Sequence, residues 1–255
     1  MSRTVCFAKR NLLEVSRDAL SYIFCVAFPL AMLAIMTLVN ESIPKEAGMT
    51  VFRIDNLTGG VCIFGQTFVM LFTALSVSKD RSGSFLVRLF ASPMKSRDFT
   101  NGYILPMLLV SLVQTALTET AGVIISLIVG YELSVPGLLL GLVLSVFSAV
   151  FFISLGLIFG TLFNQNAAPG LCSVIISLGS FLGAIWFDAE ATGGVILKIA
   201  KCLPFIYCTR LMRSAVKLDF DEGFFVSLTV VVLCAGVFAF LSSLIFKTRM
   251  KADLQ

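Results

Sequence analysis

The sequence predicts an all-α membrane protein with six transmembrane helices, and three observations support this fold class. First, 58% of the 255 residues are hydrophobic and only 13% are charged, a composition more apolar than that of soluble domains. Second, the mean hydropathy is +0.97. Third, six windows are nearly free of charge and long enough to span a bilayer core, which takes about 20 apolar residues in a helix.

The six predicted spans follow one another along the chain, and together they place residues 1–255 in a single transmembrane domain. Five of the windows contain no acidic or basic residue, and the third contains only Glu119. The first window follows a basic start but is too long for a cleaved signal peptide, so we expect it to be a retained span. The spans are predicted at 20–39, 57–77, 103–130, 136–160, 167–187 and 224–246.

The segment 1–19, before the first span, has an apolar side and a charged side. Apolar residues recur there every three or four positions, at Val5, Ala8, Leu12, Val15 and Ala19, which is typical of an amphipathic helix. We expect this helix to lie on the cytoplasmic membrane surface, with its cations facing anionic lipid or a protein partner. The alternative is that its basic residues serve only to orient the chain. The charged side carries Arg3, Arg10, Glu14, Arg17 and Asp18.

The distribution of Lys and Arg predicts that both termini are cytoplasmic, in the inner membrane of a cell. With that orientation, cytoplasmic segments carry four, five and three Lys or Arg, whereas external segments carry two and five. The five external cations lie in 188–223, which also contains the short, mainly apolar stretches 195–200 and 203–208. We therefore expect short external re-entrant helices there, whose basic side chains reach the headgroups.

The composition argues against an enzyme and against a metal site in this chain. There is no histidine, which removes the commonest general base and metal ligand. Phosphate-binding loops and the usual nucleophile motifs are also missing. The seven cysteines lack metal-binding spacing and are interpreted as packing residues. A disulfide between Cys202 and Cys208, which share the external segment, stays an open alternative.

The connection between the second and third spans contains a predicted short helix at 84–92. Ser84 can cap its start and Pro93 stops it. Arg88 points away from an apolar side made of Phe85, Leu86, Leu89 and Phe90. A cytoplasmic connection needs no such helix merely to join two spans, so the apolar side indicates docking to a partner.

The third span has a polar side, which must face protein or water. It carries Gln114, Thr118 and Glu119, with hydroxyl and glycine residues along the same side. A carboxylate inside a span is unfavourable and usually lines a pathway or pairs with another helix. For Glu119 we keep both interpretations: a contact with substrate, or a hydrogen bond to a neighbouring helix. In the second span, Gly60 and Gln66 are explained equally by close packing or by a cavity lining.

The order of these elements resembles the ABC type 2 permeases, a six-span family that exports drugs, polysaccharides and related amphiphiles. The most diagnostic stretch is DRSGSFLVRLFASP at 80–93, which is similar to the family's acidic and basic pair, glycine, leucine-rich helix and terminal Ser-Pro. The region 181–191 departs from the family by lacking an expected proline. Further matching residues are Arg17-Asp18, Phe28-Pro29-Leu30, Gly59-Gly60, Phe64-Gly65, Leu203-Pro204-Phe205, Tyr207, Arg210 and Arg213.

The resemblance implies a dimer of two permease copies, or of two homologous permeases, bound to two separate ATP-binding cassette subunits. ATP and Mg²⁺ would be bound by those subunits and no cofactor by this chain. The helix 84–92 would couple nucleotide-driven closure to the spans as a population shift. The residues assigned to coupling are Asp80, Arg81, Gly83, Phe85, Leu86, Arg88, Leu89 and Phe90.

We expect export of a hydrophobic or amphipathic drug or antibiotic. A polysaccharide or lipid-linked glycan is the alternative, disfavoured by the single Trp186 and only four tyrosines. An autonomous ion-coupled carrier is the alternative from another class, but Glu119 is its only intramembrane charge. The pathway is expected at the dimer interface, beside spans one, two and five. Membrane lipid is an expected partner and nucleic acid is not. The pathway candidates are Phe28, Gly60, Gln66, Gln114, Thr118 and Glu119.

Overall fold

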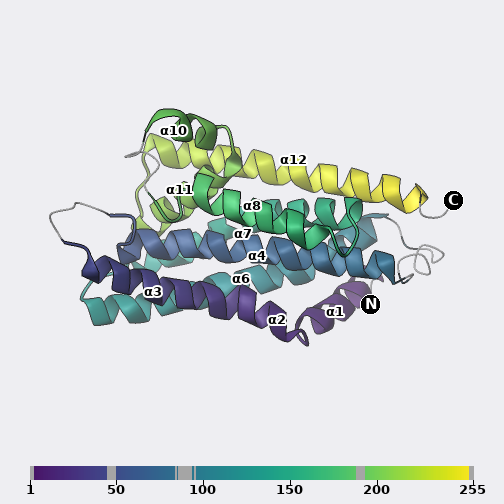
Figure 1. Cartoon of the computed structure of the whole chain (residues 1–255), viewed down its shortest axis with the longest axis horizontal. Coiled ribbons are helices and arrows are strands. Elements are labelled where there is room, and N and C mark those ends of the chain that lie inside the picture. Colours follow the sequence, from purple (N-terminus) through teal and green to yellow (C-terminus); the bar gives the residue numbers. More distant parts are fainter. Residues whose placement is uncertain are drawn as a thin grey trace.

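The computed structural model describes residues 3–44, 50–83, 85, 94, 96–187 and 193–252, without the side chains of 250–252. All secondary structure within these residues is helical, as Figure 1 shows. The all-α prediction is therefore confirmed for this part of the chain. The predicted helix at 84–92 lies almost entirely outside the described residues.

Five helices are long and apolar enough to cross a membrane. The first predicted span forms Ala19–Ser42, which consists of α2 (Ala19–Tyr22), the π-helix η1 (Ile23–Ala27) and α3 (Phe28–Ser42). The other four are α4 (Ile54–Ser82), α6 (Ser96–Val129), α7 (Val135–Leu162) and α12 (Glu222–Ala252).

The fifth predicted span is shorter than expected. The window 167–187 forms α8 (Ala168–Leu182), a helix of 15 residues, about 22 Å long at 1.5 Å per residue. Gly183 ends the helix, and Ala184 then has φ of 56°. In Figure 1 α8 runs along the bundle beside the longer helices, and the N- and C-termini lie at the same end.

The helix α4 forms the centre of the bundle. It is buried along most of its length and packs against α3, α6, α7, α8 and α11. Close packing with α7 depends on small residues, as expected where apolar helices associate in lipid. A Cβ atom added at Gly156 would lie 2.3 Å from the carbonyl oxygen of Met70, and one at Gly160 would lie 2.6 Å from that of Ala74.

The first span is widened by η1. Its Phe28 N–H donates to the Ile23 carbonyl, five residues back. Pro29 follows directly and has no N–H to donate to the Cys25 carbonyl, so a regular α-helical ladder is interrupted at this point. This interruption places a local irregularity beside the exposed rings of Phe24 and Phe28.

Two further helices occupy the predicted external segment: α10 (Gly194–Lys201) and α11 (Pro204–Lys217). The helix α11 packs into the bundle against α4, α7 and α12, and it buries Phe205, Leu211 and Met212. Residues 188–192 of the predicted segment lie outside the described residues. Both Cys202 and Cys208 are free thiols in this structure, the first exposed and the second buried.

Candidate functional site

The C-terminal end of α4 carries the charged residues that precede the predicted coupling helix. Lys79 and Arg81 lie in its last turn, where cations interact favourably with the negative end of the helix dipole. Asp80 has the opposite sign and is only 4% exposed. A buried carboxylate needs partners, and neighbouring helices supply them.

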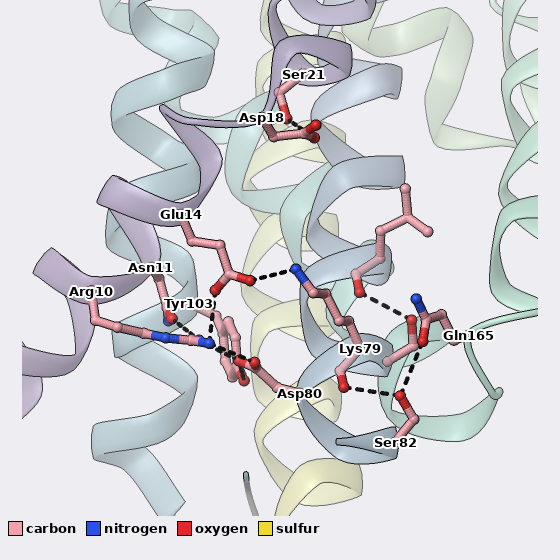
Figure 2. A network of polar contacts seen from close by, with 12 residues as sticks. Arg10, Asn11, Glu14, Asp18, Ser21, Lys79, Asp80, Ser82, Tyr103 and Gln165 are labelled. Atoms are coloured by element: carbon pink, nitrogen blue, oxygen red, sulfur yellow. Dashed lines mark hydrogen bonds and ion pairs between the residues drawn. The ribbon is translucent and has the colours of Figure 1, made fainter. Parts of the chain in front are cut away.

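Asp80 accepts three hydrogen bonds from two other helices (Figure 2). The amphipathic helix α1 (Arg3–Val15) supplies Arg10, whose Nη1 and Nη2 donate to the carboxylate at 2.6 and 2.8 Å. Tyr103 of α6 donates its hydroxyl at 2.7 Å. This bidentate, charge-assisted arrangement fixes the orientation of both partners. We call Arg10, Glu14, Lys79, Asp80 and Tyr103 the α1–α4 polar cluster.

The outer side of the polar cluster consists of two ion pairs, one within α1 and one between α1 and α4. Glu14 contacts Arg10 at 2.8 Å and Lys79 at 2.8 Å, as seen in Figure 2. The first pair is four residues apart on α1 and the second joins α1 to α4. Burial would lower the pKa of Arg10, but the hydrogen bond and charge of Asp80, with the charge of Glu14, raise it above its ordinary value. Arg10 therefore stays a cation and keeps the cluster closed.

The same end of α4 is also tied to α7 and to the turn before α8. The Ser82 hydroxyl lies 3.1 Å from Gln165 Oε1, to which it donates. Arg81 donates to the carbonyl of Thr161 in the last turn of α7. The last turn of α4 is thus held from both sides, by α1 and by the α7–α8 connection.

The helix α1 packs on α6 as well as on α4. Asn11 Nδ2 donates to the Gly102 carbonyl at 3.0 Å, and a Cβ atom at Gly102 would lie 2.3 Å from Phe7. Phe7, Asn11 and Val15, spaced by four, form the buried side. Val5, from the apolar side predicted by sequence, is 44% exposed. Arg10 and Glu14 contact α4 of the same chain instead of only facing outward.

The polar cluster also contacts the first residue of the coupling segment that the structure describes. The guanidinium of Arg10 lies 4.3 Å above the centre of the Phe85 ring, a cation–π contact. Phe85 packs on an aromatic group that includes Phe99 and Tyr103. Four of the residues assigned to coupling lie within the described part of the chain: Asp80, Arg81, Gly83 and Phe85. Leu86, Arg88, Leu89 and Phe90 lie outside the described residues.

Four of the pathway candidates are buried between helices of this chain. Gln66 of α4 donates to the Ser145 carbonyl of α7 at 3.2 Å, and Gln114 of α6 donates to the Thr118 hydroxyl at 3.1 Å. Glu119 is 6% exposed, and its Oε1 lies 2.9 Å from where a Cβ atom of Gly141 would be. Within the described residues, one side-chain oxygen of each of Gln66, Gln114 and Glu119 has no hydrogen-bond partner.

The other two candidates lie in different surroundings. Gly60 allows α11 to approach α4, since a Cβ atom there would lie 3.3 Å from Nη2 of Arg213. Phe28 is 38% exposed, and its ring lies 5.7 Å from that of Phe64 and 5.5 Å from that of Phe68. The six candidates therefore do not form one group: an exposed aromatic patch and a buried polar row are separate.

An open cavity of about 860 Å³ lies beside the polar cluster. Its walls come from α1, α2, α4 and the turn before α8, the last represented by Gln165. Phe72 and Leu75 give it an apolar side, whereas Arg17 and Lys79 are among its charged residues. This combination of apolar and charged walls suits an amphipathic molecule.

Sequence reasoning missed the role of α1 in this site. The motif at 80–93 identified Asp80 and Arg81 as site residues. It gave no reason to assign Arg10, Glu14 or Tyr103 to the same site. The available signal was an acid directly after an apolar span, because a carboxylate that becomes buried there needs a partner from another helix. Within the described part of the chain, no group of three or more Cys, Asp or Glu residues is placed to hold a metal ion.

Comparison with known proteins identifies the family of the chain. A family model described as ABC-2 type transporter matches residues 4–217. The match runs from the first turn of α1 to the last residue of α11 and includes the whole polar cluster. A search of curated proteins finds no match.

Proposed function

The chain belongs to the ABC-2 type transporter family, and on that premise we propose that it is the permease subunit of an ATP-driven exporter. ATP and Mg²⁺ bind to a separate ATP-binding cassette subunit, and this chain supplies the route through the membrane. It crosses the inner membrane six times, with α8 as the short crossing and both termini in the cytoplasm. The common end of the two termini in Figure 1 supports an even number of crossings.

The polar cluster is the observation that carries the proposal. It fixes the last turn of α4 to α1 and α6 where the predicted coupling helix begins, and Arg10 also contacts Phe85. A force applied to the segment 84–92 by a moving ATPase subunit would therefore reach three helices at once. Rigid attachment at this point is what a coupling element needs to shift the bundle between two arrangements.

The cavity beside the cluster supports a pathway at the proposed dimer interface. It is bounded by residues of the first and second spans and by Gln165 in the turn before α8, close to the three spans assigned to the pathway. The nearby aromatic patch of Phe24, Phe28, Phe64 and Phe68 consists mainly of phenylalanine rings, with the ring of Trp186 packed against Phe64 at 5.0 Å. Such walls favour a hydrophobic or amphipathic substrate, a drug or antibiotic, over a glycan.

Changing Leu86 and Leu89 to Asp tests the coupling helix. Two carboxylates would enter an apolar docking surface, and burying an unpaired charge is strongly unfavourable. We expect ATP-driven export from vesicles to fall at least about tenfold, which corresponds to about 1.4 kcal/mol. Copurification of the ATP-binding subunit should weaken in parallel.

The matched control is the change of both leucines to Met, which keeps the docking surface apolar and should retain most of the export. If the Asp variant still exports normally, the segment 84–92 does not couple the two subunits. If the purified chain transports without any ATP-binding partner, the exporter proposal itself is wrong and an ion-coupled carrier is favoured.

A further inference from the structure

A second cavity, of about 300 Å³, lies at the end of the bundle opposite the polar cluster. It is formed by the first turn of α4, the turn after α8, and α11 with the residues that follow it. Figure 1 places α11 at the end of the bundle away from both termini. Its volume is at the lower end of the range for ligand sites, so it suits a small polar group.

Three cations line this cavity from one side of a single helix. Arg210, Arg213 and Lys217 are spaced by three and four residues along α11 and all line the cavity. Residues at this spacing lie on the same side of a helix. Ser214 adds a hydroxyl group at the same wall, whereas the Thr209 hydroxyl, also at this wall, donates to the Phe205 carbonyl at 3.3 Å. The wall therefore offers charged and neutral hydrogen-bond donors together.

Arg213 is held in place by main-chain atoms of two other elements. Its Nε donates to the Asn56 carbonyl of α4 at 3.0 Å, and its Nη2 donates to the Ile185 carbonyl after α8 at 3.2 Å. Gly59 makes this approach possible, because a Cβ atom there would lie 3.0 Å from the Arg213 main-chain nitrogen. The guanidinium is thus a fixed part of the cavity wall.

The charges around the cavity sum to a positive value. Two acids, Asp219 and Asp221, also line it. Asp221 accepts a hydrogen bond from the Phe224 main-chain N–H at 2.7 Å, which caps α12. Lys217 lies 3.5 Å from Asp55, but Asp55 is paired more closely with Arg53, at 2.6 Å. With Arg53 counted beside the three cations of α11, four positive charges stand against the three acids Asp55, Asp219 and Asp221, an excess of one.

The N-terminus of α4 adds to this positive potential. The helix is 29 residues long, and its N-cap residue, Arg53, makes no side-chain capping bond. Asn56, in the first turn, lines the cavity. The positive end of the helix dipole favours an anion nearby, and Asp55 in the same turn already supplies one carboxylate.

We propose that this cavity binds a phosphate group. Phosphate has several acceptor oxygens and suits a wall with two guanidinium groups, one ammonium group and the Ser214 hydroxyl. Free inorganic phosphate and the phosphate of an anionic lipid headgroup share this chemistry. The site lies at the other end of the bundle from the polar cluster, and Arg213 in its wall approaches the pathway candidate Gly60. Its test measures binding to the purified chain and needs no transport assay.

Binding of two probes to the purified full-length chain tests the proposal. The probes are inorganic phosphate, followed by calorimetry, and soluble dihexanoyl phosphatidic acid, followed by native mass spectrometry. In the variant Arg210→Gln with Lys217→Gln, we expect affinity for the bound probe to fall about tenfold, since two charge-assisted contacts are lost. Arg213 is left unchanged because it links α11 to α4 and to the turn after α8.

The matched control is Lys198→Gln with Lys201→Gln, which removes two exposed cations from neighbouring α10 and should leave affinity unchanged. Asp219→Asn removes an acid from the wall and should tighten binding severalfold. Binding of either probe with this pattern supports the site, and the probe that binds identifies the source of the phosphate. The proposal is overturned if neither probe binds. It is also overturned if the α10 control variant weakens binding as much as the variant Arg210→Gln with Lys217→Gln does.

Discussion

Asp80→Ala is expected to reduce ATP-driven export at least about tenfold and to loosen α1 from the bundle. The change removes the acceptor of three hydrogen bonds, two from Arg10 and one from Tyr103. Breaking a fully buried ion pair costs about 3–5 kcal/mol. Asp80 is only 5% exposed but the Arg10 side chain is 36% exposed, so solvent screening reduces the expected loss to about 1–3 kcal/mol. Thermal unfolding in detergent and proteolysis within α1 measure this loss.

The neighbouring residues provide the comparison for Asp80. Tyr103→Phe removes one hydrogen bond and keeps the ring, so we expect a loss of about 1 kcal/mol and a small effect on export. A double-mutant cycle with Asp80→Asn and Arg10→Gln should give a coupling energy of at least about 0.5 kcal/mol. Additive effects in this cycle, or normal export by Asp80→Ala, would contradict the role given to the polar cluster.

Gly156→Val should have the largest effect on folding. A Cβ atom at this position would lie 2.3 Å from the Met70 carbonyl oxygen and 2.9 Å from Cβ of Thr73. Because the first obstacle is main chain, α7 would have to move away from α4, the most buried helix of the bundle. Overpacking of this kind costs about 1–3 kcal/mol or more, and we expect most of the folded protein to be lost from the membrane fraction.

Gly236 supplies the control for this prediction. It lies in α12, which is also a membrane-spanning helix, and nothing lies within 4 Å of a Cβ atom added there. Gly236→Val should therefore fold at close to the normal level. Equal losses in the two variants, measured by size-exclusion chromatography of membrane extracts, would show that close contact between α4 and α7 is not what Gly156 provides.

Hydropathy located the spans but not their ends. The second span was predicted at 57–77, because an apolar window stops at the first charged residue on each side. The helix α4 is longer and runs from Ile54 to Ser82. Asp55 and Asp80 extend the helix because they are paired, with Arg53 and Arg10 respectively. At α8 the predicted span was longer than the helix instead of shorter. The apolar run continues to Phe187, but the helix ends at Leu182 because Gly183 begins a turn.

The candidate site was predicted only where a local motif marked it. Asp80 and Arg81 belong to a contiguous pattern, so the sequence could identify them. Glu14 and Tyr103 join them through contacts across 65 and 23 residues of chain, and helical periodicity carries no information about such distant pairs. The charged side of α1 was expected to face anionic lipid or a protein partner, whereas Arg10 and Glu14 contact α4 of the same chain, which only the tertiary structure could reveal.

The short length of α8 matters for the free-energy barrier that a solute would meet in the proposed pathway. In the proposed dimer this helix flanks the pathway, and it extends about 22 Å, compared with a hydrocarbon layer of about 30 Å. In that dimer, a solute moving past α8 would traverse a thinner apolar barrier than one dissolving through the surrounding lipid. The proposed exporter would then need less work from nucleotide hydrolysis for each translocation step.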